Sequence, residues 1–195
     1  MKQILDSIAG SINTLDKPII IGISGFGGSG KSTVAIKLGK KLNAPVVGID
    51  SFSKSNVHEA YELWKVMDYS RLEKEVLTPF TLGEQEIAYN EFDWEKNSIG
   101  KERSFKNRGV LIVEGVGLLR PELMQYFSYT IWVDCPIEEA TERGKKRDRE
   151  EYNCPQDEYW EGIWQKNDLQ CFEKFSPKVN ADYILDNSKQ FPLNS

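Results

Sequence analysis

The chain has 195 residues and a formal net charge of −5 at pH 7. This length suits a single α/β domain, and the acidic balance disfavours nucleic acid or a membrane surface as the partner, so we expect a small-molecule partner. The first residues contain one lysine and no hydrophobic run, and no stretch reaches the about 18 apolar residues of a membrane span. We therefore expect a cytoplasmic protein.

The N-terminal segment, residues 1–16, has the pattern of an amphipathic helix. Apolar residues recur at intervals of three and four over residues 2–15: Ile4, Leu5, Ile8, Ile12 and Leu15. Such a stripe ordinarily packs on the core of its own domain. We therefore expect this helix to cap the domain, and the alternative is a docking helix for a partner.

A strand, a glycine-rich loop and a helix are predicted over residues 19–42. The loop is Gly25-Phe26-Gly27-Gly28-Ser29-Gly30-Lys31-Ser32-Thr33, which contains Gly-x-x-x-x-Gly-Lys-Ser. Its glycines let successive backbone N–H groups surround a phosphate at the start of the helix. Lys31 would reach the β and γ phosphates and Ser32 would hold Mg²⁺. Residues 25–33 are thus the predicted nucleotide-binding loop, and a chance Gly/Ser turn is the alternative.

The elements that follow are a short strand and a longer helical segment. Residues 45–50 are predicted to form a buried strand that ends on Asp50. Residues 56–77 have a helical pattern, with a break near Met67-Asp68 and an end at Thr78-Pro79. Residues 83–100 mix polar and aromatic side chains without a clear period, and we expect either a hairpin or a loop over the site.

The second half of the chain alternates strands and helices. Strands are predicted at residues 109–115, 129–134 and 181–185, and helices at 121–126, 136–151 and 156–175. The first two of these strands are apolar on both faces, as parallel strands are when helices cover each side of a sheet. The alternation predicts one domain, residues 1–195, with a three-layer, doubly wound parallel sheet that binds ligands at the carboxyl ends of its strands.

Two classes of phosphate-loop protein lack support in this sequence. A GTPase should carry an Asn-Lys-x-Asp segment that recognises guanine, and none is present. An assembly ATPase would usually end an apolar strand on paired Asp-Glu, whereas the strand at residues 109–115 carries a lone Glu114. A carboxylate next to the glycine loop can bind a water on Mg²⁺. Pairing of Glu114 with Lys31 in the empty protein is the alternative.

Four segments, in this order and spacing, carry a family resemblance. They are the glycine loop, Ile-Asp-Ser-Phe-Ser at 49–53, Leu-Ile-Val-Glu-Gly at 111–115 and Arg-Gly-Lys-Lys-Arg-Asp at 143–148. Together they resemble the uridine kinase and phosphoribulokinase family of small-molecule kinases, over about residues 18–186. The resemblance implies a P-loop NTPase fold of the nucleoside kinase type with a helical lid at about residues 136–153. It also implies ATP and Mg²⁺ as cofactors and a small-molecule alcohol as acceptor, and it leaves a homo-oligomer open.

The resemblance implies a catalytic role for Asp50. This residue matches the Asp of the family's Asp-x-Phe-Tyr motif, which takes a proton from the acceptor hydroxyl, although Ser53 stands where the family usually has Tyr. A carboxylate at the carboxyl end of a strand, beside the γ phosphate, suits this role. The alternative is an Asp that caps the next turn by accepting hydrogen bonds from the amides of Phe52 or Ser53.

Residues 142–149 contain five cations in eight positions. A solvated helix face is the ordinary explanation of such a run. In a kinase, the segment is similar to the lid whose arginines neutralise the charge on the transferring phosphoryl group. Arg143 and Arg147 are four residues apart, hence on one helix face, and we assign both to catalysis together with Lys31. Gly144 replaces the family's second Arg, which predicts a looser lid.

The acceptor site is predicted from four residues. Asp68 resembles the family's ribose-binding Asp, and residues 89–94 look like a divergent form of its Tyr-Asp-Phe base pocket, which adds Tyr89, Asp93 and Trp94. Aromatic side chains with an interleaved acid suit a ring with hydroxyl groups. A small aromatic cluster under a loop is the alternative.

The sequence departs from the uridine enzymes where they bind their base. These enzymes use a His shortly after Tyr-Asp-Phe, and here Lys96 and Asn97 stand near its position. His58, the single histidine, is expected to be a surface residue of a helix. Another nucleoside, nicotinamide riboside, a pantothenate-like alcohol or a sugar therefore stay open as acceptors.

The sequence thus predicts an ATP-dependent kinase that phosphorylates a hydroxyl of a small molecule, with a nucleoside such as uridine or a related riboside as the favoured acceptor. An ATP-binding regulatory or assembly module that modifies no metabolite is the alternative from another class. An inactive kinase relative, which would bind ATP and transfer nothing, is a further alternative.

Overall fold

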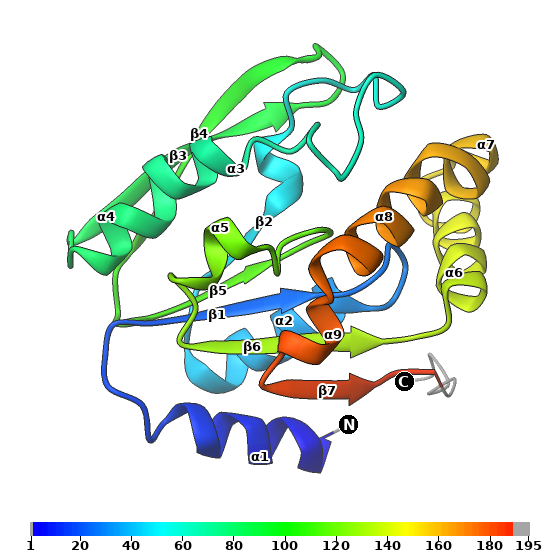
Figure 1. The fold of residues 1–195 in the computed structure, drawn as a ribbon. Helices are drawn as coiled ribbons and strands as arrows, with labels where there is room; N and C mark the ends of the chain where they lie inside the picture. The colour runs from blue at the N-terminus through cyan, green and yellow to red at the C-terminus, as the bar shows by residue number, and fades with distance from the viewer. Residues whose placement is uncertain (1, 189–195) are drawn as a thin grey trace.

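The computed structural model describes residues 2–188, in which helices cover both faces of a five-stranded sheet (Figure 1). The strand order is β2-β5-β1-β6-β7, and every neighbouring pair is parallel. The strands are β1 (Ile19–Ser24), β2 (Val46–Gly48), β5 (Val110–Glu114), β6 (Tyr129–Asp134) and β7 (Tyr183–Asp186). The predicted three-layer, doubly wound parallel sheet is confirmed.

The side chains of strand β1 divide between two hydrophobic clusters, because successive residues of a strand point to opposite faces of the sheet. Ile19, Ile21 and Ile23 pack with helix α2 (Lys31–Leu42), whereas Ile20 packs in the cluster on the other face. Helix α5 (Pro121–Met124) covers this second face (Figure 1). Burial on both faces accounts for the continuous apolar run of the strand.

Helix α1 (Lys2–Ile12) buries its apolar stripe against the sheet. Leu5, Ile8 and Ile12 are at most 1% exposed, and they share a cluster with β1 and α2. The helix ends at Ile12, and a turn follows over the rest of the predicted span, residues 13–15. The protein's own core therefore occupies this stripe.

The predicted helix over residues 56–77 is wrong in its first half. Residues 54–68 form a loop of turns and bends. Leu63 and Trp64 in this loop have φ angles of 56° and 54°, which a right-handed helix excludes. The backbone N–H of Trp64 donates to Asn167 Oδ1 at 2.6 Å instead of to a carbonyl of its own segment. A partner that is distant in sequence thus overrides the helical pattern.

One helix follows this loop in three parts, α3 (Tyr69–Leu72), a π turn (Glu73–Leu77) and α4 (Thr78–Thr81). The predicted stop at Thr78-Pro79 is wrong, because the helix widens before the proline. The backbone N–H of Thr78 donates to the carbonyl oxygen of Glu73, five residues earlier. The wider turn accommodates a ring that would clash with the preceding turn of a regular α-helix.

Residues 83–100 contribute to a hairpin, one of the two forms expected for them. Its strands are β3 (Glu86–Asp93) and β4 (Ser98–Lys106), which pair in antiparallel fashion with a register shift between Asn90 and Phe92. The hairpin lies beside the 3₁₀ turn Ile49–Phe52 that follows β2, since Tyr89 stacks on Phe52 with ring centroids 5.3 Å apart. It therefore borders the end of the strand that carries Asp50.

The helices of the C-terminal half follow the predicted order. They are α6 (Ile137–Glu150), α7 (Asp157–Tyr159), a π turn (Trp160–Trp164), α8 (Gln165–Phe175) and α9 (Pro177–Asn180). The helical run over 157–175 is kinked at Gly162, whose φ and ψ are both −108°. Within residues 2–188, no helix combines the length and the apolar character that crossing a membrane requires.

Candidate active site

The glycine-rich loop joins β1 to the N-terminus of α2 at the carboxyl end of the sheet (Figure 1). Gly28 and Gly30 have φ angles of 79° and 99°, in the left-handed region that favours glycine. A Cβ atom at Gly28 would also overlap the carbonyl oxygen of Ala140 in helix α6. The sequence needs glycine here because the loop backbone both turns sharply and touches the helix of the predicted lid.

Lys31, the first residue of α2, is 7% exposed and turns back over the loop. Its Nζ donates to the carbonyl oxygen of Phe26 at 2.8 Å. Burial raises the pKa values of the carboxyl groups of Asp50, Glu114 and Asp168, and the Lys31 ammonium opposes each rise. Within the described part of the chain, Lys31 forms no ion pair with Glu114, so the alternative expected for Glu114 does not appear.

Ser32 and Glu114 lie together beside the loop. Ser32 Oγ donates to Glu114 Oε1 at 3.1 Å, which joins the start of α2 to the end of β5. Hydroxyl and carboxylate oxygens are ligands that suit Mg²⁺. The described residues contain no group of three or more His, Cys, Asp and Glu side chains that could hold a metal ion by itself. This donor set fits a magnesium ion that takes most of its ligands from phosphates and water.

Asp50 lies on the 3₁₀ turn after β2 and lines a cavity of about 1020 Å³. Gly27 of the glycine loop and Arg147 of α6 line the same cavity. Asp50 keeps an exposed surface toward the cavity, but the protein packed around its carboxyl group displaces water and raises its pKa, and Lys31 and then Arg147 oppose this rise. No hydrogen bond from Phe52 or Ser53 to Asp50 occurs among the described residues, so the capping alternative finds no support. The carboxylate is free to accept a proton from a molecule in the cavity.

The two arginines assigned to the lid differ in their surroundings. Arg147 lines the cavity, and its Nη2 donates to Asp148 Oδ1 at 2.8 Å. Arg143 does not line the cavity, and its Nη2 donates to Glu139 Oε1 at 2.5 Å, one turn earlier in the same helix. The structure therefore brings Arg147 to Asp50 and leaves Arg143 on an intrahelical ion pair.

Gly144 packs closely against Trp160. A Cβ atom at Gly144 would overlap the six-membered ring of this indole, and a Cβ atom at Gly27 would come within 2.9 Å of the same ring. The indole Nε1 donates to Asp148 Oδ2 at 2.7 Å. Trp160 thus lies between the glycine loop and α6, and the missing side chain at Gly144 makes room for it.

Replacing Gly144 with alanine is expected to lower the free energy of unfolding by about 1–3 kcal/mol, because the added methyl group overpacks the contact with Trp160. Urea denaturation measures the change. Gly10→Ala is the matched control, since Gly10 lies in α1 with nothing within 4 Å of the added Cβ, and alanine there should be neutral or stabilising. Equal stability of the two variants would contradict the packing argument.

Of the four predicted acceptor residues, only Trp94 lines the cavity. Asp68 caps α3, where its Oδ1 accepts from the backbone N–H of Arg71 at 3.1 Å. Asp93 binds Lys96 in the hairpin turn, with Nζ and Oδ2 at 2.7 Å. Tyr89, as described above, stacks on Phe52. The structure does not bring Asp68, Tyr89 and Asp93 to the cavity.

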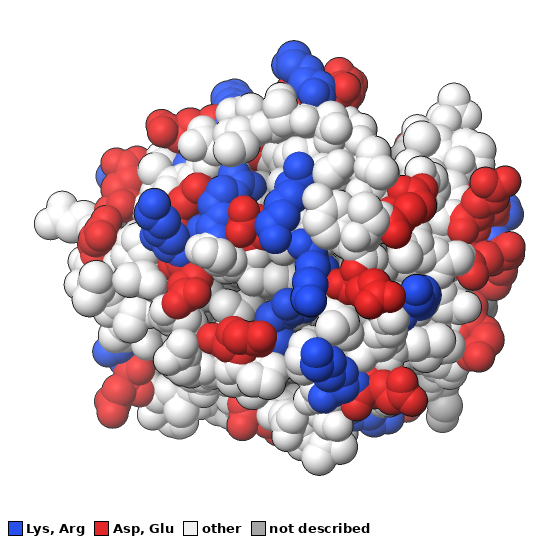
Figure 2. Space-filling model, turned by 45° about the horizontal axis from the view of Figure 1, so that its top comes forward, with Lys and Arg blue, Asp and Glu red and all other residues white. Residues whose placement is uncertain are grey.

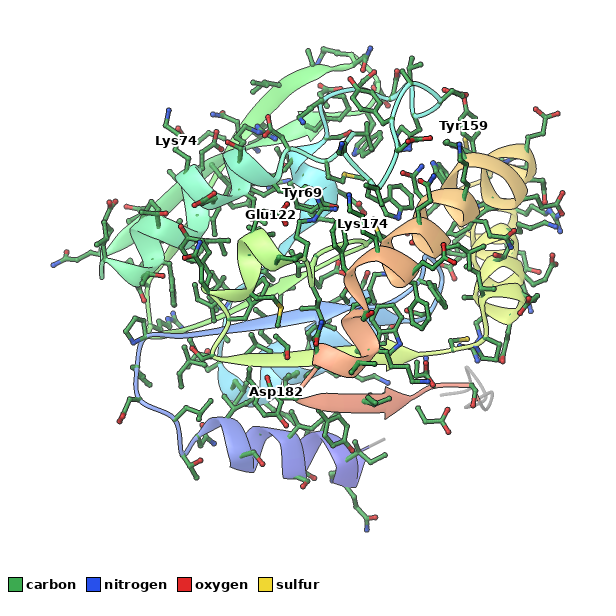
Figure 3. The ribbon with its side chains drawn as sticks, viewed as in Figure 1. Tyr69, Lys74, Glu122, Tyr159, Lys174 and Asp182 are labelled. Atoms are coloured by element: carbon green, nitrogen blue, oxygen red, sulfur yellow. The ribbon has the colours of Figure 1, made fainter. Side chains whose placement is uncertain are left out.

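The expectation that His58 is a surface helix residue is wrong on both points. His58 lies in the loop over 54–68, is 5% exposed and lines the cavity. Its Nδ1 accepts from Nε1 of Trp164 at 2.7 Å. Tyr159, labelled in Figure 3, lies where α7 approaches the same loop, and its hydroxyl shares a hydrogen bond with Glu59. Contacts with the last helical run therefore hold this loop over the cavity.

Asp168 is a residue of the site that sequence reasoning missed. It lies in α8, is 6% exposed, and accepts two hydrogen bonds, from the Gly27 amide at 2.6 Å and from Trp64 Nε1 at 2.8 Å. One carboxylate thus links the glycine loop to the loop over 54–68. Its sequence context, a charged position in an amphipathic helix, carries no signal of this role.

The affinity for ATP is expected to depend on the protonation of Asp168. Burial raises the pKa of this carboxyl group to about 6, so it is neutral well below pH 6 and charged above. The charge next to Gly27 repels a triphosphate, and ATP should bind on the order of 10-fold more weakly at pH 7.5 than at pH 5. Asp168→Asn is the control, since it keeps the proton equilibria of ATP and removes this group. Calorimetry that finds the same pH dependence in both proteins would contradict the expectation.

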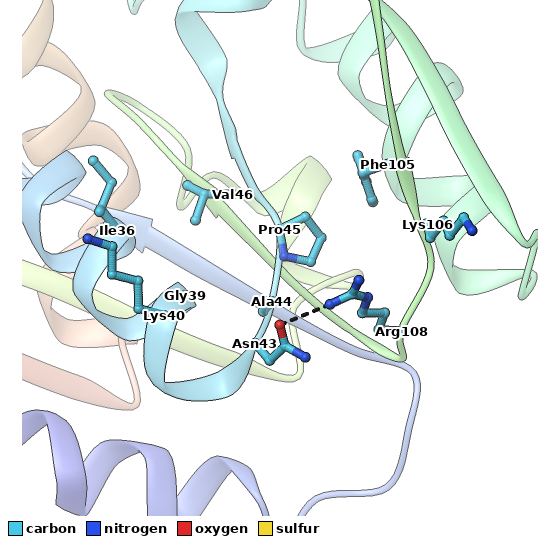
Figure 4. Close-up of a pocket in the computed structure, with 10 residues that line it drawn as sticks. All are labelled: Ile36, Gly39, Lys40, Asn43, Ala44, Pro45, Val46, Phe105, Lys106 and Arg108. Carbon is cyan, nitrogen blue, oxygen red and sulfur yellow. Dashed lines mark hydrogen bonds between the residues drawn. The ribbon is translucent and has the colours of Figure 1, made fainter.

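A second pocket lies away from these residues. It has a volume of about 650 Å³ and is lined by Ile36, Gly39, Lys40, Asn43, Ala44, Pro45, Val46, Phe105, Lys106 and Arg108 (Figure 4). These residues surround the amino end of β2, whereas α/β sheets bind ligands at the carboxyl ends of their strands.

On the face shown in Figure 2, Lys and Arg side chains are mixed with Asp and Glu. Neither the second pocket nor this mixed surface charge competes with the cavity at Asp50 as the candidate active site.

The chain is similar to known proteins over most of its length. A family model described as an AAA domain matches residues 21–162. A uridine kinase of Alkaliphilus metalliredigens is 30% identical over 148 residues, and the match covers 70% of this chain and 71% of the relative.

Solved structures share the fold at lower sequence identity. A "possible uridine kinase" from Bacillus stearothermophilus has a TM-score of 0.71 and 19% identity, over 95% of this chain and 98% of that one. D-glycerate 3-kinase from Cryptococcus neoformans has a TM-score of 0.65 and 10% identity, over 98% and 99% of the two chains. At these identities the likeness concerns the fold alone. The family match and the uridine kinase relative show that this chain belongs to the AAA domain family and to the uridine kinase-like P-loop kinases.

Proposed function

We propose that this protein transfers the γ-phosphoryl group of ATP to a hydroxyl group of a small molecule. The observation that carries the proposal is the shared cavity, which Gly27, Asp50 and Arg147 all line. Catalysis of phosphoryl transfer rests on positioning and on electrostatic stabilisation, so the phosphate loop, the base and a cation must meet in one place.

The residues around the cavity divide the reaction among them. The loop amides that have no partner within the protein and the Lys31 ammonium bind the β and γ phosphates, whereas the Gly27 amide donates to Asp168. Asp50 takes the proton of the acceptor hydroxyl while the hydroxyl oxygen of the acceptor bonds to the γ phosphorus. The bond from the γ phosphorus to the oxygen that bridges the β and γ phosphates breaks. ADP leaves with the electron pair, and Arg147 stabilises the charge. Mg²⁺, which Ser32 and Glu114 would hold, neutralises phosphate charge when bound.

The acceptor that we propose is a nucleoside such as uridine or a related riboside. The uridine kinase relative supports this choice, and so does the aromatic lining of the cavity, which includes Trp64, Trp94 and Trp164. Aromatic side chains provide a surface for a flat ring, while the 5′-hydroxyl would reach Asp50. A cavity of about 1020 Å³ has the size of a small-molecule site.

The test is the release of ADP from Mg·ATP in the presence of uridine, other nucleosides, nicotinamide riboside, pantothenate and sugars. One of these alcohols should stimulate the release severalfold, and mass spectrometry should find its phosphate ester. Slow ATP hydrolysis that no alcohol changes would overturn the proposal. It would favour the regulatory module instead.

A further inference from the structure

The turn that carries Asp50 is held in place by an arginine outside the cavity. Asp50 lies on the 3₁₀ turn Ile49–Phe52, and none of the described residues donates a hydrogen bond to its carboxylate. The backbone of the turn therefore sets the position of this carboxylate. Arg71 of helix α3 lies beside the turn, and its Nη2 donates to the carbonyl oxygen of Ser51 at 2.7 Å. This bond fixes the residue next to the proposed base.

The same guanidinium group also reaches the hairpin. Its Nη1 donates to the carbonyl oxygen of Asn90 in β3 at 2.9 Å, and its Cζ lies 4.8 Å from the centroid of the Phe52 ring. A planar guanidinium can donate to two carbonyl groups while its face stacks on a ring, whereas a lysine ammonium offers a single point of contact. Arg71 therefore joins the turn to the hairpin.

Two neighbours of Arg71 hold the turn as well. The backbone N–H of Asp68 donates to the carbonyl oxygen of Phe52 at 2.7 Å, and the Asp68 carboxylate accepts from the backbone N–H of Arg71. From the hairpin, the Tyr89 hydroxyl shares a hydrogen bond with Ser51. Asp68 and Tyr89, which the sequence assigns to the acceptor, thus contact the turn of Asp50 instead.

The position of Arg71 separates it from the groups that meet the reactants. Gly27, Asp50 and Arg147 line the cavity, and Arg71 does not. Arg71 can therefore affect the chemistry through the placement of Asp50, without touching ATP or the acceptor. Placement matters because a shift of a reacting group by about 1 Å can lower a rate on the order of 10²-fold.

We propose that Arg71 is a positioning residue of the phosphoryl transfer. Its guanidinium group holds the turn Ile49–Phe52 against the hairpin and so keeps the Asp50 carboxylate directed into the cavity. This inference rests on the proposed function, in which Asp50 is the base, and deepens it.

The first test is the turnover of Arg71→Met with the alcohol that stimulates ADP release. Methionine keeps an apolar stem and a similar helix propensity but has no N–H donor. At saturating Mg·ATP and acceptor, well below the melting temperature, kcat should fall by about 10- to 100-fold, while the affinity for ATP stays near wild type. Arg71→Lys should recover part of the loss, because an ammonium can donate to Ser51 but not to both carbonyl groups.

Two control variants lie in the same helical run. Lys74 (Figure 3) is exposed, and its side chain forms no hydrogen bond or ion pair within the described part of the chain, so Lys74→Met removes only the charge. Glu75 Oε2 accepts from the backbone N–H of Asn90 at 3.4 Å, so Glu75→Met weakens a hairpin contact without touching Ser51. Both variants should keep kcat. A loss in either control as large as in Arg71→Met would overturn the inference.

A double-mutant cycle tests whether Arg71 acts through Asp50. Asp50→Asn has no base to position, so adding Arg71→Met to it should lower the residual rate little further. If Arg71→Met lowered the rate of Asp50→Asn by the same factor as that of the wild type, Arg71 would act independently of Asp50 and the inference would fall.

Hydrogen exchange, followed by mass spectrometry, tests the turn without turnover. The backbone amides of residues 49–53 should exchange at least about 10-fold faster in Arg71→Met, since a charged hydrogen bond to the turn is lost, and those of helix α2 should not change. A loss of kcat without faster exchange at residues 49–53 would overturn the inference.

The two proposals fail in different ways. An alcohol that stimulates ADP release equally in Arg71→Met and in the wild type would overturn the positioning role alone and leave phosphoryl transfer standing. ADP release that no alcohol stimulates in the wild type would overturn the transfer, and the positioning role with it, even if the turn exchanged faster in Arg71→Met.

Discussion

Replacing Asp50 with asparagine is expected to lower kcat by about 10²- to 10⁴-fold while ATP binds at least as tightly as to the wild type, since a negative charge near the phosphates is removed. The amide cannot take the proton of the acceptor hydroxyl. None of the described residues donates a hydrogen bond to Asp50, so asparagine breaks no contact of the folded protein. The loss should therefore appear in turnover and not in the melting temperature. The measurement is ADP release at saturating acceptor, together with ATP binding by calorimetry.

The pH–rate profile provides a second readout of the same variant. Only charged Asp50 can act as a base, and burial raises its pKa from the ordinary value of 3.8. The rate of the wild-type protein should fall as the pH drops through this raised pKa, and the residual rate of Asp50→Asn should lack this fall. Glu158→Gln, an exposed acid that lines the same cavity, is the control and should keep the profile. If Asp50→Asn had the same kcat as the wild-type protein, another group would have to take the proton.

Local patterns were sufficient to predict the sheet and the glycine loop. The run of isoleucines in β1, the glycines of the loop and the helical spacing after Lys31 each act within a few residues of chain, and all three agree. The strand that ends near Asp50 is one such element, although β2 ends at Gly48 and Asp50 lies on the turn that follows. The carboxyl end of a strand lies at the ligand-binding edge of the sheet. A carboxylate two residues beyond that end, such as Asp50, is therefore still at this edge.

The acceptor side of the cavity was not predictable in the same way. The loop over 54–68 takes its shape from hydrogen bonds to Asn167, Asp168 and Trp164. The bonded residues are 103 to 106 positions apart in the sequence. No periodicity within the loop contains that information, and its spacing favours a helix. His58 is buried in this loop, where its Nδ1 accepts a hydrogen bond from Trp164. The residues of this loop that line the cavity are therefore placed by tertiary contacts and not by local pattern.

Replacing Arg147 with glutamine is expected to lower kcat by about 10²- to 10³-fold, since this removes a cation from the cavity in which charge develops on the leaving phosphate. Glutamine can still donate to Asp148, the acceptor of the Arg147 guanidinium at 2.8 Å, so the contact within α6 has a substitute. Arg147 also lowers the pKa of Asp50. The acidic limb of the pH–rate profile should therefore move to higher pH in this variant, an effect that a purely structural role of Arg147 would not produce.

Lys146→Gln is the matched control for this experiment. Lys146 neighbours Arg147 in α6, but its side chain is 70% exposed and pairs with Glu150 at 4.0 Å. The Lys146→Gln substitution removes the same charge from the helix without changing the cavity. Solvent screens the field of the Lys146 ammonium at the cavity. Both the rate and the acidic limb should therefore stay near wild type. If Arg147→Gln and Lys146→Gln gave the same kcat and the same profile, the cation that stabilises the transferring group would have to come from elsewhere, and Arg143 would first have to leave Glu139 to supply it.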